Sequence, residues 1–338
     1  MKKIVLHITF LVILTLSFTA WGQRDPQLSQ QYFSRLNINP AATDVSNYAN
    51  AFLIARQQWI GFEGAPSTQM FNAHGYVSDI RSSIGLSVLN DIVGNNRFLN
   101  MMLNYGYHMK VGEESYFALG LGAGVVTRSF GGDLITDVPE TDPDIIRMLA
   151  GQSIFRPDIN LGLTYWSPNF SFGLSATHLA RYAMKDDDWF KPPLHIYAFL
   201  DAGFNINETT RFTLRPQLLS SIGSVNTIKI AEDTIQTINI MERMDILLDL
   251  AAIVSMVDKF WIGGSFRVSS FSPFGGASFA AIVGFNITPD LRIGYSYDHK
   301  IGNSFQNIKT YGSHEIMLNY RMKIAEPQTA EKTPRFFD

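Results

Sequence analysis

The sequence contains no cysteine, and this absence excludes several kinds of chemistry. With no thiol among 338 residues, the chain has no disulfides, no thiolate metal sites and no lipid attached through an N-terminal cysteine. Charge is also scarce, because only 17% of the residues are charged, against roughly 25% in a typical soluble domain. The balance of 27 basic and 30 acidic side chains gives no electrostatic reason to expect nucleic acid as a partner. A charge-poor chain that is 46% hydrophobic fits a structure with two unlike faces.

The first 22 residues are predicted to be a cleaved secretory signal peptide. Lys2 and Lys3 precede an apolar run at 4–18, and small residues at 20 and 22 form the pattern of a cleavage site. This order of regions is typical of export signals, and cleavage is expected before Gln23. An uncleaved membrane anchor is the alternative, but the run is short and polar sequence follows at once. We therefore expect the protein to work outside the cytoplasm.

Beyond the signal peptide, hydrophobicity alternates with a period of two. No apolar stretch of about 18 residues follows position 22, so the sequence offers no transmembrane helix. Alternation of large apolar residues with small or polar ones is typical of strands with one greasy face. The pattern predicts fourteen strands, at 50–58, 67–77, 82–91, 98–111, 115–128, 157–166, 170–178, 194–206, 210–222, 244–257, 260–268, 277–287, 291–298 and 314–324.

The connections between these strands alternate in length. Those after even-numbered strands are tight polar turns, whereas those after odd-numbered strands are longer, most of all at about 129–156, 179–193 and 223–243. Outer-membrane barrels show this alternation, with short turns in the periplasm and long loops outside. We therefore predict an all-β fold, a transmembrane antiparallel β-barrel of about 14 strands with both termini periplasmic. A soluble β-sandwich is the alternative, but its strands are usually only about 5–6 residues long.

The predicted organisation has four parts: a signal peptide at 1–22, a periplasmic N-terminal segment at 23–46, the barrel at 47–324 and a polar tail at 325–338. The N-terminal segment is polar, contains Pro26, Asn39 and Pro40, and lacks a clear period. We expect it to dock a periplasmic partner or to plug the lumen, and a disordered lead-in is the alternative. The tail offers Phe336 and Phe337 as anchors for a partner, although chain ends are commonly disordered.

The connection from Trp59 to Pro66 is the best candidate for binding a partner protein. It combines Trp59, Phe62 and Glu63 with two glycines in a short loop at the predicted outer rim. Aromatic anchors are a common source of binding energy at interfaces. The alternative is that Trp59 and Phe62 fold inward as a lid above a pair formed by Arg56 and Glu63.

Two further predictions concern the lumen and the membrane interfaces. Met101, Leu247 and Ile253 are expected to point inward, which would suit a filled lumen better than a water channel. Aromatic residues near strand ends are expected to form the girdles that mark the two membrane interfaces of such barrels. The candidates for these girdles are Tyr107, Tyr116, Trp166, Phe170, Trp261, Tyr295 and Tyr320.

The sequence predicts no metal, no cofactor and no catalytic site. The aspartates at 186–188 lack the spacing of a calcium-binding loop. The seven histidines show no spacing typical of metal ligands, and each is expected to be a polar residue of the lumen or rim. No nucleophile elbow, phosphate loop or dinucleotide fingerprint occurs. We therefore expect that the protein is not an enzyme, since a hydrolase would have to gather its residues from several strands.

Six stretches, in this order, resemble the PorP/SprF family. Several motifs in one order are more specific than any single motif, and the resemblance runs from the signal peptide to the last strand. The stretches are DPQLSQ at 25–30, NINPA at 37–41, RQQWIGFEGAP at 56–66, LSVLND at 86–91, LRIGYSYD at 291–298 and GSHEIML at 312–318.

The resemblance implies an outer-membrane component of the type IX secretion system, which exports large proteins and adhesins in gliding and related bacteria. Its members are associated with periplasmic ring proteins, with a peptidoglycan-binding lipoprotein, or with export and surface attachment of an adhesin. We therefore expect a non-enzymatic scaffold in the outer membrane of a Gram-negative bacterium, in contact with lipid and with one of these partners. A passive porin or solute channel is the alternative.

Overall fold

The computed structural model describes residues 25–46, 48–130, 153–184, 190–223, 243–257, 259–269, 277–301 and 311–324. Three features of the sequence analysis lie outside these described residues. They are the signal peptide predicted at 1–22, the aspartates at 186–188, and the tail at 325–338 with Phe336 and Phe337.

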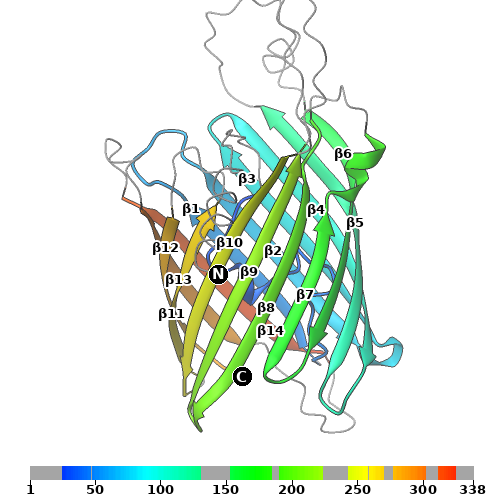
Figure 1. The fold of residues 1–338 in the computed structure, drawn as a ribbon, viewed down its shortest axis with the longest axis vertical. Helices are drawn as coiled ribbons and strands as arrows, with labels where there is room; N and C mark the ends of the chain where they lie inside the picture. Colours follow the sequence, from blue (N-terminus) through cyan, green and yellow to red (C-terminus); the bar gives the residue numbers. More distant parts are fainter. Residues whose placement is uncertain are drawn as a thin grey trace, which may run out of the picture.

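Fourteen antiparallel strands close into one barrel (Figure 1). Each strand pairs with its neighbours in the sequence, and β1 completes the ring against β14. The predicted fold class and strand number are therefore confirmed. The strands are β1 Tyr48–Gln57, β2 Ser67–Val77, β3 Ser82–Val93, β4 Asn96–Lys110, β5 Tyr116–Phe130, β6 Ser153–Trp166, β7 Phe170–Thr177, β8 Leu194–Asn207, β9 Thr210–Gly223, β10 Arg243–Met256, β11 Phe260–Ser269, β12 Ala277–Asn286, β13 Leu291–Ile301 and β14 Ser313–Lys323.

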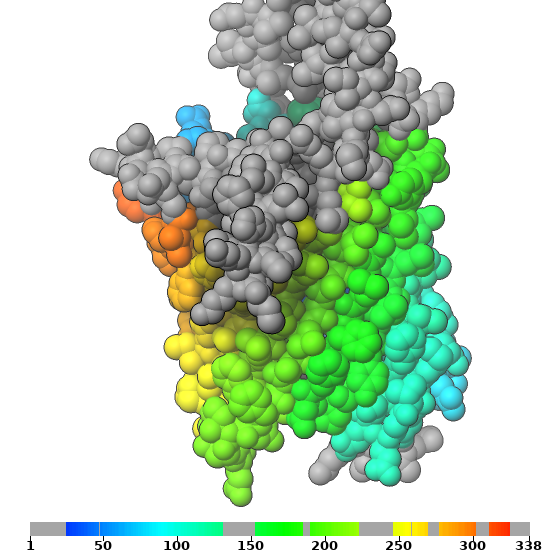
Figure 2. Space-filling view, viewed as in Figure 1, coloured from blue at the N-terminus to red at the C-terminus, as the bar shows by residue number. Residues whose placement is uncertain are grey.

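The wall of the barrel has an apolar outer face and a more polar inner face. In β4, Leu103 and Tyr105 are exposed, whereas Asn104 and His108 are buried. Successive side chains of a strand point to opposite faces, so this alternation puts one set into lipid and the other into the lumen. Figure 2 shows the outer side chains as a continuous cover over neighbouring strands.

The predictions for inward-facing residues are partly correct. Leu247 and Ile253 are buried on the inner face, as expected. The prediction for Met101 is wrong, because this residue is 37% exposed while Met102 is buried. Trp261 does not belong to an interfacial girdle, since it is buried and its ring lies 5.5 Å from that of Phe33 inside the barrel.

Alternation of short and long connections fails at one place. The predicted strand at 82–91 continues to Val93, and Gly94 and Asn95 join β3 to β4 in a tight hairpin. Gly94 has a φ of 56°, a conformation that glycine adopts without the strain of a side chain. The connections after β5, β7 and β9 are long, as predicted.

Short 3-10 helices accompany the strands in the described part of the chain: η1 Gln31–Phe33, η2 Ser78–Ile80 and η3 Leu179–Ala183. None of the helices among the described residues has the length and apolar character needed to cross a membrane.

Residues 25–46, here called the plug segment, lie inside the ring of strands, where the dark blue start of the described chain runs in Figure 1. Their partners come from several parts of the wall: Ser34 contacts Asn72 of β2 and Arg35 contacts Asp201 of β8. A segment with partners around the wall fills the lumen. This is the plug placement that the sequence analysis offered beside docking of a periplasmic partner.

The plug segment runs along the barrel axis. It starts at Asp25, beside His178 at the end of β7 that leads into a long connection. It ends before Tyr48, which pairs with Lys323 at the end of β14 near the tight turns. The described chain thus begins and ends in different halves of the barrel. The termini themselves lie outside the described residues, so their shared periplasmic side stays a prediction. Which barrel end faces the periplasm stays a prediction.

Candidate functional site

The first residues of the plug segment are held by an apolar cluster that lines the lumen. Leu28, Tyr32 and Phe33 pack against inward side chains of several strands. These side chains are Phe52 and Ile54 of β1, Met70 of β2, Leu89 of β3, Ala251 and Ile253 of β10, Trp261 of β11, Ala280 and Ile282 of β12 and Met317 of β14. The cluster explains why a barrel with a mainly polar inner face carries large apolar side chains there. They bury apolar surface against the plug segment instead of facing water.

A buried cluster of charges fixes the backbone at Ser29 and Gln30. Their N–H groups donate to the two carboxylate oxygens of Glu315, at 2.8 and 2.7 Å. Arg56 forms ion pairs with Asp298 and with Glu315, the latter at 3.2 Å, and also donates to the Ser29 hydroxyl at 2.8 Å. All five residues are buried. Arg56 therefore pairs with both buried carboxylates, and its predicted pairing with Glu63 is wrong.

An arginine of the plug segment forms a second buried ion pair midway along the barrel. The guanidinium of Arg35 donates to both carboxylate oxygens of Asp201, at 2.6 and 2.9 Å. It also lies over the ring of Phe199, 4.0 Å from the centroid. A bidentate pair stacked on an aromatic ring combines charge with fixed geometry. We call residues 25–35, with these charged contacts, the loop half of the plug segment.

Residues 38–45, the turn half of the plug segment, are held mainly by neutral hydrogen bonds. The Asn39 amide donates to the carbonyl of Leu163 at 3.1 Å, and the Ser175 hydroxyl donates to the carbonyl of Ile38 at 2.7 Å. Near the tight turns, the hydroxyl of Thr43 lies 2.6 Å from that of Ser83.

Two inward glycines allow the turn half to approach the wall. A Cβ at Gly120 would clash with the backbone of Pro40 and Ala41, and one at Gly162 would clash with the Asn39 amide. These glycines explain why some inward-facing positions in the alternating sequence pattern have small side chains.

Asp44 is the charged exception in the turn half. Its carboxylate accepts a hydrogen bond from Asn50 at 3.0 Å and lies 3.6 Å from the His74 imidazole. Burial alone would raise the pKa of Asp44, but the hydrogen bonding and charge of His74 hold this pKa below its usual value.

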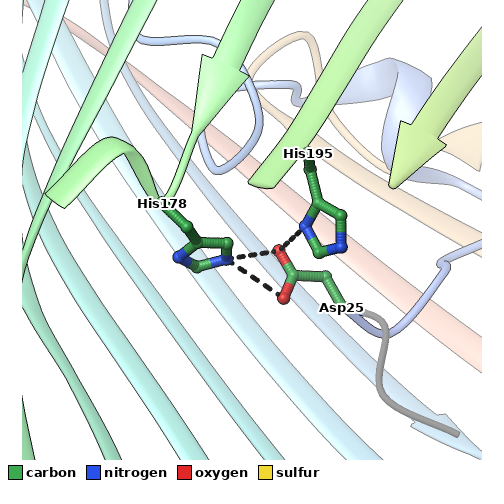
Figure 3. Close-up of side chains that lie close together, drawn as sticks. All are labelled: Asp25, His178 and His195. Carbon is green, nitrogen blue, oxygen red and sulfur yellow. Dashed lines mark hydrogen bonds and ion pairs between the residues drawn. The ribbon is translucent and has the colours of Figure 1, made fainter. Parts of the chain in front are cut away.

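The start of the plug segment meets two histidines of the wall (Figure 3). Asp25 lies between the rings, with one carboxylate oxygen 3.1 Å from His178 Nε2 and 3.3 Å from His195 Nδ1. One ligand atom from each of the three residues lies within 4.8 Å of the others. Both histidines are fully buried. His178 follows β7 and His195 begins β8, so the barrel brings them to one place.

A second carboxylate orients His178. Asp158 of β6 is buried and lies 2.7 Å from Nδ1 of His178, and the backbone N–H of His178 donates to Asn160 at 3.1 Å. His178 has a φ of 63°, which is uncommon for a residue with a side chain. Contacts on both ring nitrogens and a constrained backbone thus fix the direction of this imidazole.

The electrostatics of this cluster favour positive charge at its centre. Burial alone would raise the pKa of Asp25, but the charges of His178 and His195 hold it well below its usual value. Burial alone would lower the pKa of His178, yet attraction to Asp25 and the hydrogen bonds that its ring donates to Asp158 and Asp25 raise it to about 10. The carboxylates of Asp25 and Asp158 therefore favour a positive charge at the His178 imidazole, which lies between them.

The residues predicted to bind partners lie in two separate places. Asn39 and Pro40 are buried in the lumen, and Pro26 lies half-buried near the start of the plug segment. Phe62 and Glu63 are exposed in the connection after β1, while Trp59 is half-buried with the Lys300 ammonium 4.5 Å from its ring centroid.

Backbone hydrogen bonds tie the connection after β1 to its neighbours. Ile60 exchanges N–H···O bonds with Gly312 and Tyr311, at 3.0 and 2.9 Å, and Gly94 donates to Gly64 at 2.9 Å. The side chains of Ile60, Phe62 and Tyr311 are 36%, 50% and 73% exposed. We call these three residues the rim patch. It is held by backbone contacts while its apolar side chains face outward.

Sequence reasoning missed the cluster of Asp25, His178 and His195. The residues come from the plug segment and from two strand ends, so no local spacing joins them. One signal was present: strand alternation placed His195 on the same face as Tyr197 and Phe199, which are buried inside the barrel.

Comparison with known families accounts for nearly the whole chain. The family described as type IX secretion system membrane protein PorP/SprF matches residues 20–320. The chain belongs to this family. Together with the closed fourteen-strand barrel, membership identifies an outer-membrane protein of a Gram-negative bacterium and a component of type IX secretion. No curated protein matches the chain.

Several solved outer-membrane barrels resemble this family member at low sequence identity. The Ralstonia pickettii toluene transporter TbuX is 10% identical over 88% of this chain and 94% of its own, with a TM-score of 0.48. The Pseudomonas putida toluene transporter TodX is 8% identical over 91% and 96%, with a TM-score of 0.47. The Acinetobacter baumannii outer membrane protein Omp33 is 11% identical over 82% and 98%, with a TM-score of 0.41.

Proposed function

We propose that this barrel is a plugged, non-enzymatic anchor that holds other components of the type IX secretion system at the outer membrane. The partners would be periplasmic ring proteins or a peptidoglycan-binding lipoprotein, or an adhesin during its export and surface attachment. The observation that carries the proposal is the lumen, which the chain fills with its own residues 25–46. A barrel closed by buried ion pairs and an apolar cluster suits a role in holding partners better than a role in passing solutes.

The rim patch is the surface that we assign to the adhesin, because it lies at the predicted outer rim, on the side away from the periplasmic partners. Its apolar side chains are exposed, and its backbone is tied to two neighbouring connections. A pre-ordered aromatic surface loses little conformational entropy on binding, and aromatic residues are common anchors at interfaces.

Affinity isolation from cell envelopes tests this assignment. We expect the unaltered protein to recover ring proteins, a lipoprotein or one large adhesin, and Phe62→Ala combined with Tyr311→Ala to lose most of the adhesin while leaving recovery of periplasmic partners unchanged. Tyr182→Ala is the matched control, because Tyr182 is 62% exposed but lies in η3, away from the rim patch. Recovery of none of these partners by the unaltered protein would contradict the proposal.

Electrical recording in planar bilayers separates the anchor from a porin. We expect the purified barrel to pass no large steady current, because the plug segment occupies its lumen. A large steady current through the unaltered protein would favour the porin and count against a plugged anchor.

A further inference from the structure

We propose that Asp25, His178 and His195 form a site for a divalent transition-metal ion, with Zn²⁺ as the best-suited ion, and that this ion fastens the start of the plug segment to the barrel wall. The set of ligands is two imidazole nitrogens and one carboxylate oxygen, a combination that suits zinc. The site is independent of which partner the barrel holds.

Two of the three distances between the ligand atoms match those around a bound zinc ion. Zinc lies about 2.0–2.1 Å from nitrogen and oxygen ligands, so two ligands at a tetrahedral angle are about 3.3 Å apart. The Asp25 oxygen lies 3.1 Å from His178 Nε2 and 3.3 Å from His195 Nδ1. All three ligand atoms lie within 4.8 Å of one another. One ion can therefore reach them with small adjustments.

The second carboxylate prepares His178 for such an ion. Asp158 lies 2.7 Å from Nδ1, and if it accepts the proton there, the lone pair of Nε2 faces Asp25. Nε2 and the Asp25 oxygen, 3.1 Å apart, need a shared cation between them, which is either a proton on Nε2 or a bound metal ion. Metal-bound histidines commonly donate their other N–H to a carboxylate in this way.

His195 supplies an independent observation. Within the described part of the chain, neither of its ring nitrogens has an aligned hydrogen-bond partner, although the side chain is fully buried. Nδ1 faces the Asp25 carboxylate at 3.3 Å without the geometry of a hydrogen bond. A buried imidazole with unsatisfied nitrogens is costly, and coordination of an ion would satisfy the nitrogen that faces the cluster.

Charge balance also favours a divalent ion. Asp25 and Asp158 bring two negative charges to a site that is largely shielded from water, where unpaired charge is expensive. A proton on His178 offsets only one of these charges, whereas one divalent ion offsets both. By joining a residue of the plug segment to β8 and to the residue after β7, the ion would clamp the plug segment to the wall.

Zinc uptake by the full mature barrel tests the proposal. The protein is purified in detergent through a tag without histidine, treated with a chelator, dialysed against Zn²⁺ and analysed for metal by mass spectrometry. We expect about one zinc per chain in the unaltered protein and loss of that zinc in His195→Ala. Asp158→Asn is expected to weaken zinc binding by about 10–100-fold, because it removes the group that orients His178.

His74→Ala is the matched control. His74 is also buried beside a plug-segment carboxylate, Asp44, but without a second histidine in that contact, so its loss should leave zinc uptake unchanged. Asp25→Asn provides a second ligand variant that alters no wall residue, should His195→Ala fail to fold. The proposal is overturned if the unaltered protein takes up no stoichiometric zinc, or if folded His195→Ala and Asp25→Asn each retain it.

A second measurement follows the plug segment itself. Trypsin can cut after Arg35 only when the plug segment leaves the lumen, so the rate of this cleavage reports its release. We expect zinc to slow the cleavage in the unaltered barrel and to have no effect in Asp25→Asn. Equal slowing in both proteins would contradict the clamp.

Discussion

The two halves of the plug segment are held in different ways. The loop half relies on buried charges, with Ser29 and Gln30 at Glu315, Arg35 at Asp201, and Asp25 between two histidines. The turn half relies on close packing and neutral hydrogen bonds, as at Asn39 and Thr43. Charged contacts respond to protons, ions and partners, whereas packing does not. The difference suggests that the loop half is the part of the plug segment that conditions or a partner could release.

Replacing Arg56, which pairs with the carboxylates that hold the loop half, should cause the largest loss of stability. Arg56→Ala leaves Asp298 and Glu315 buried without their counter-ion, and we expect the free energy of unfolding to fall by about 3–5 kcal/mol. Urea unfolding in detergent or lipid vesicles measures this loss. Arg97→Ala is the control, because Arg97 is exposed and donates to Asn90 at the surface. Equal losses in the two variants would show that the buried cluster is not an anchor.

A rescue variant sharpens this test. Combining Arg56→Met with Asp298→Asn and Glu315→Gln removes all three charges together, so no buried carboxylate is left unpaired. We expect this triple variant to be more stable than Arg56→Ala, since buried ion pairs can often be replaced by neutral groups at little cost. If the triple variant were no more stable than Arg56→Ala, the stability lost in Arg56→Ala would come from packing and not from unpaired charge.

The stability that the turn half contributes should depend on how closely it packs against the barrel wall. Gly120→Val places a side chain where the backbone of Pro40 and Ala41 lies, and we expect a loss of about 1–3 kcal/mol in unfolding free energy from overpacking. Gly75→Ala is the control, because its Cβ would meet only the end of the flexible Ile324 side chain, at 3.1 Å, and ordinary contacts near 4.0 Å. If Gly120→Val were as stable as Gly75→Ala, the turn half would not be packed against β5.

The smallest effect should come from Asp44, the charged exception in the turn half. Its pKa is lowered in the folded state, so its ionised form adds stability above the unfolded pKa of about 3.9. This contribution is lost as the pH falls through the lower folded pKa. The stability difference between the unaltered protein and Asp44→Asn, measured from pH 6 down to pH 2, should therefore shrink. A stability difference that stays constant with pH would show that the ionised form of Asp44 does not stabilise the folded protein.

The barrel could be predicted from the sequence because strand alternation is a local signal. The strand at 67–77 was predicted with its observed limits, and the inner positions of Leu247 and Ile253 followed from the same parity. The error at Met101 arose because Met101 and Met102 are alike. The exposed Leu103 and Tyr105 would have decided the parity, since they lie on the same face as Met101.

The contents of the lumen could be predicted only in part. A polar segment with Pro26 and Pro40 indicated a plug or a docking segment but could not choose between them. The choice depends on contacts between residues far apart in the sequence, such as Ser29 with Glu315 and Asp25 with His178. The partner of Arg56 was mispredicted for the same reason, because the nearby Glu63 was chosen and the distant Asp298 was not visible.

The absence of cysteine from the chain makes a direct test of the filled lumen simple. Thr43→Cys and Ser83→Cys place two thiols where hydroxyl oxygens lie 2.6 Å apart, one on the plug segment and one on β3. Under mild oxidation of outer membranes, peptide mass spectrometry should find these cysteines joined by a disulfide in most molecules, with each single variant as control. Two free thiols that both react with a maleimide, and no cross-linked peptide, would contradict a plug segment that passes through the barrel.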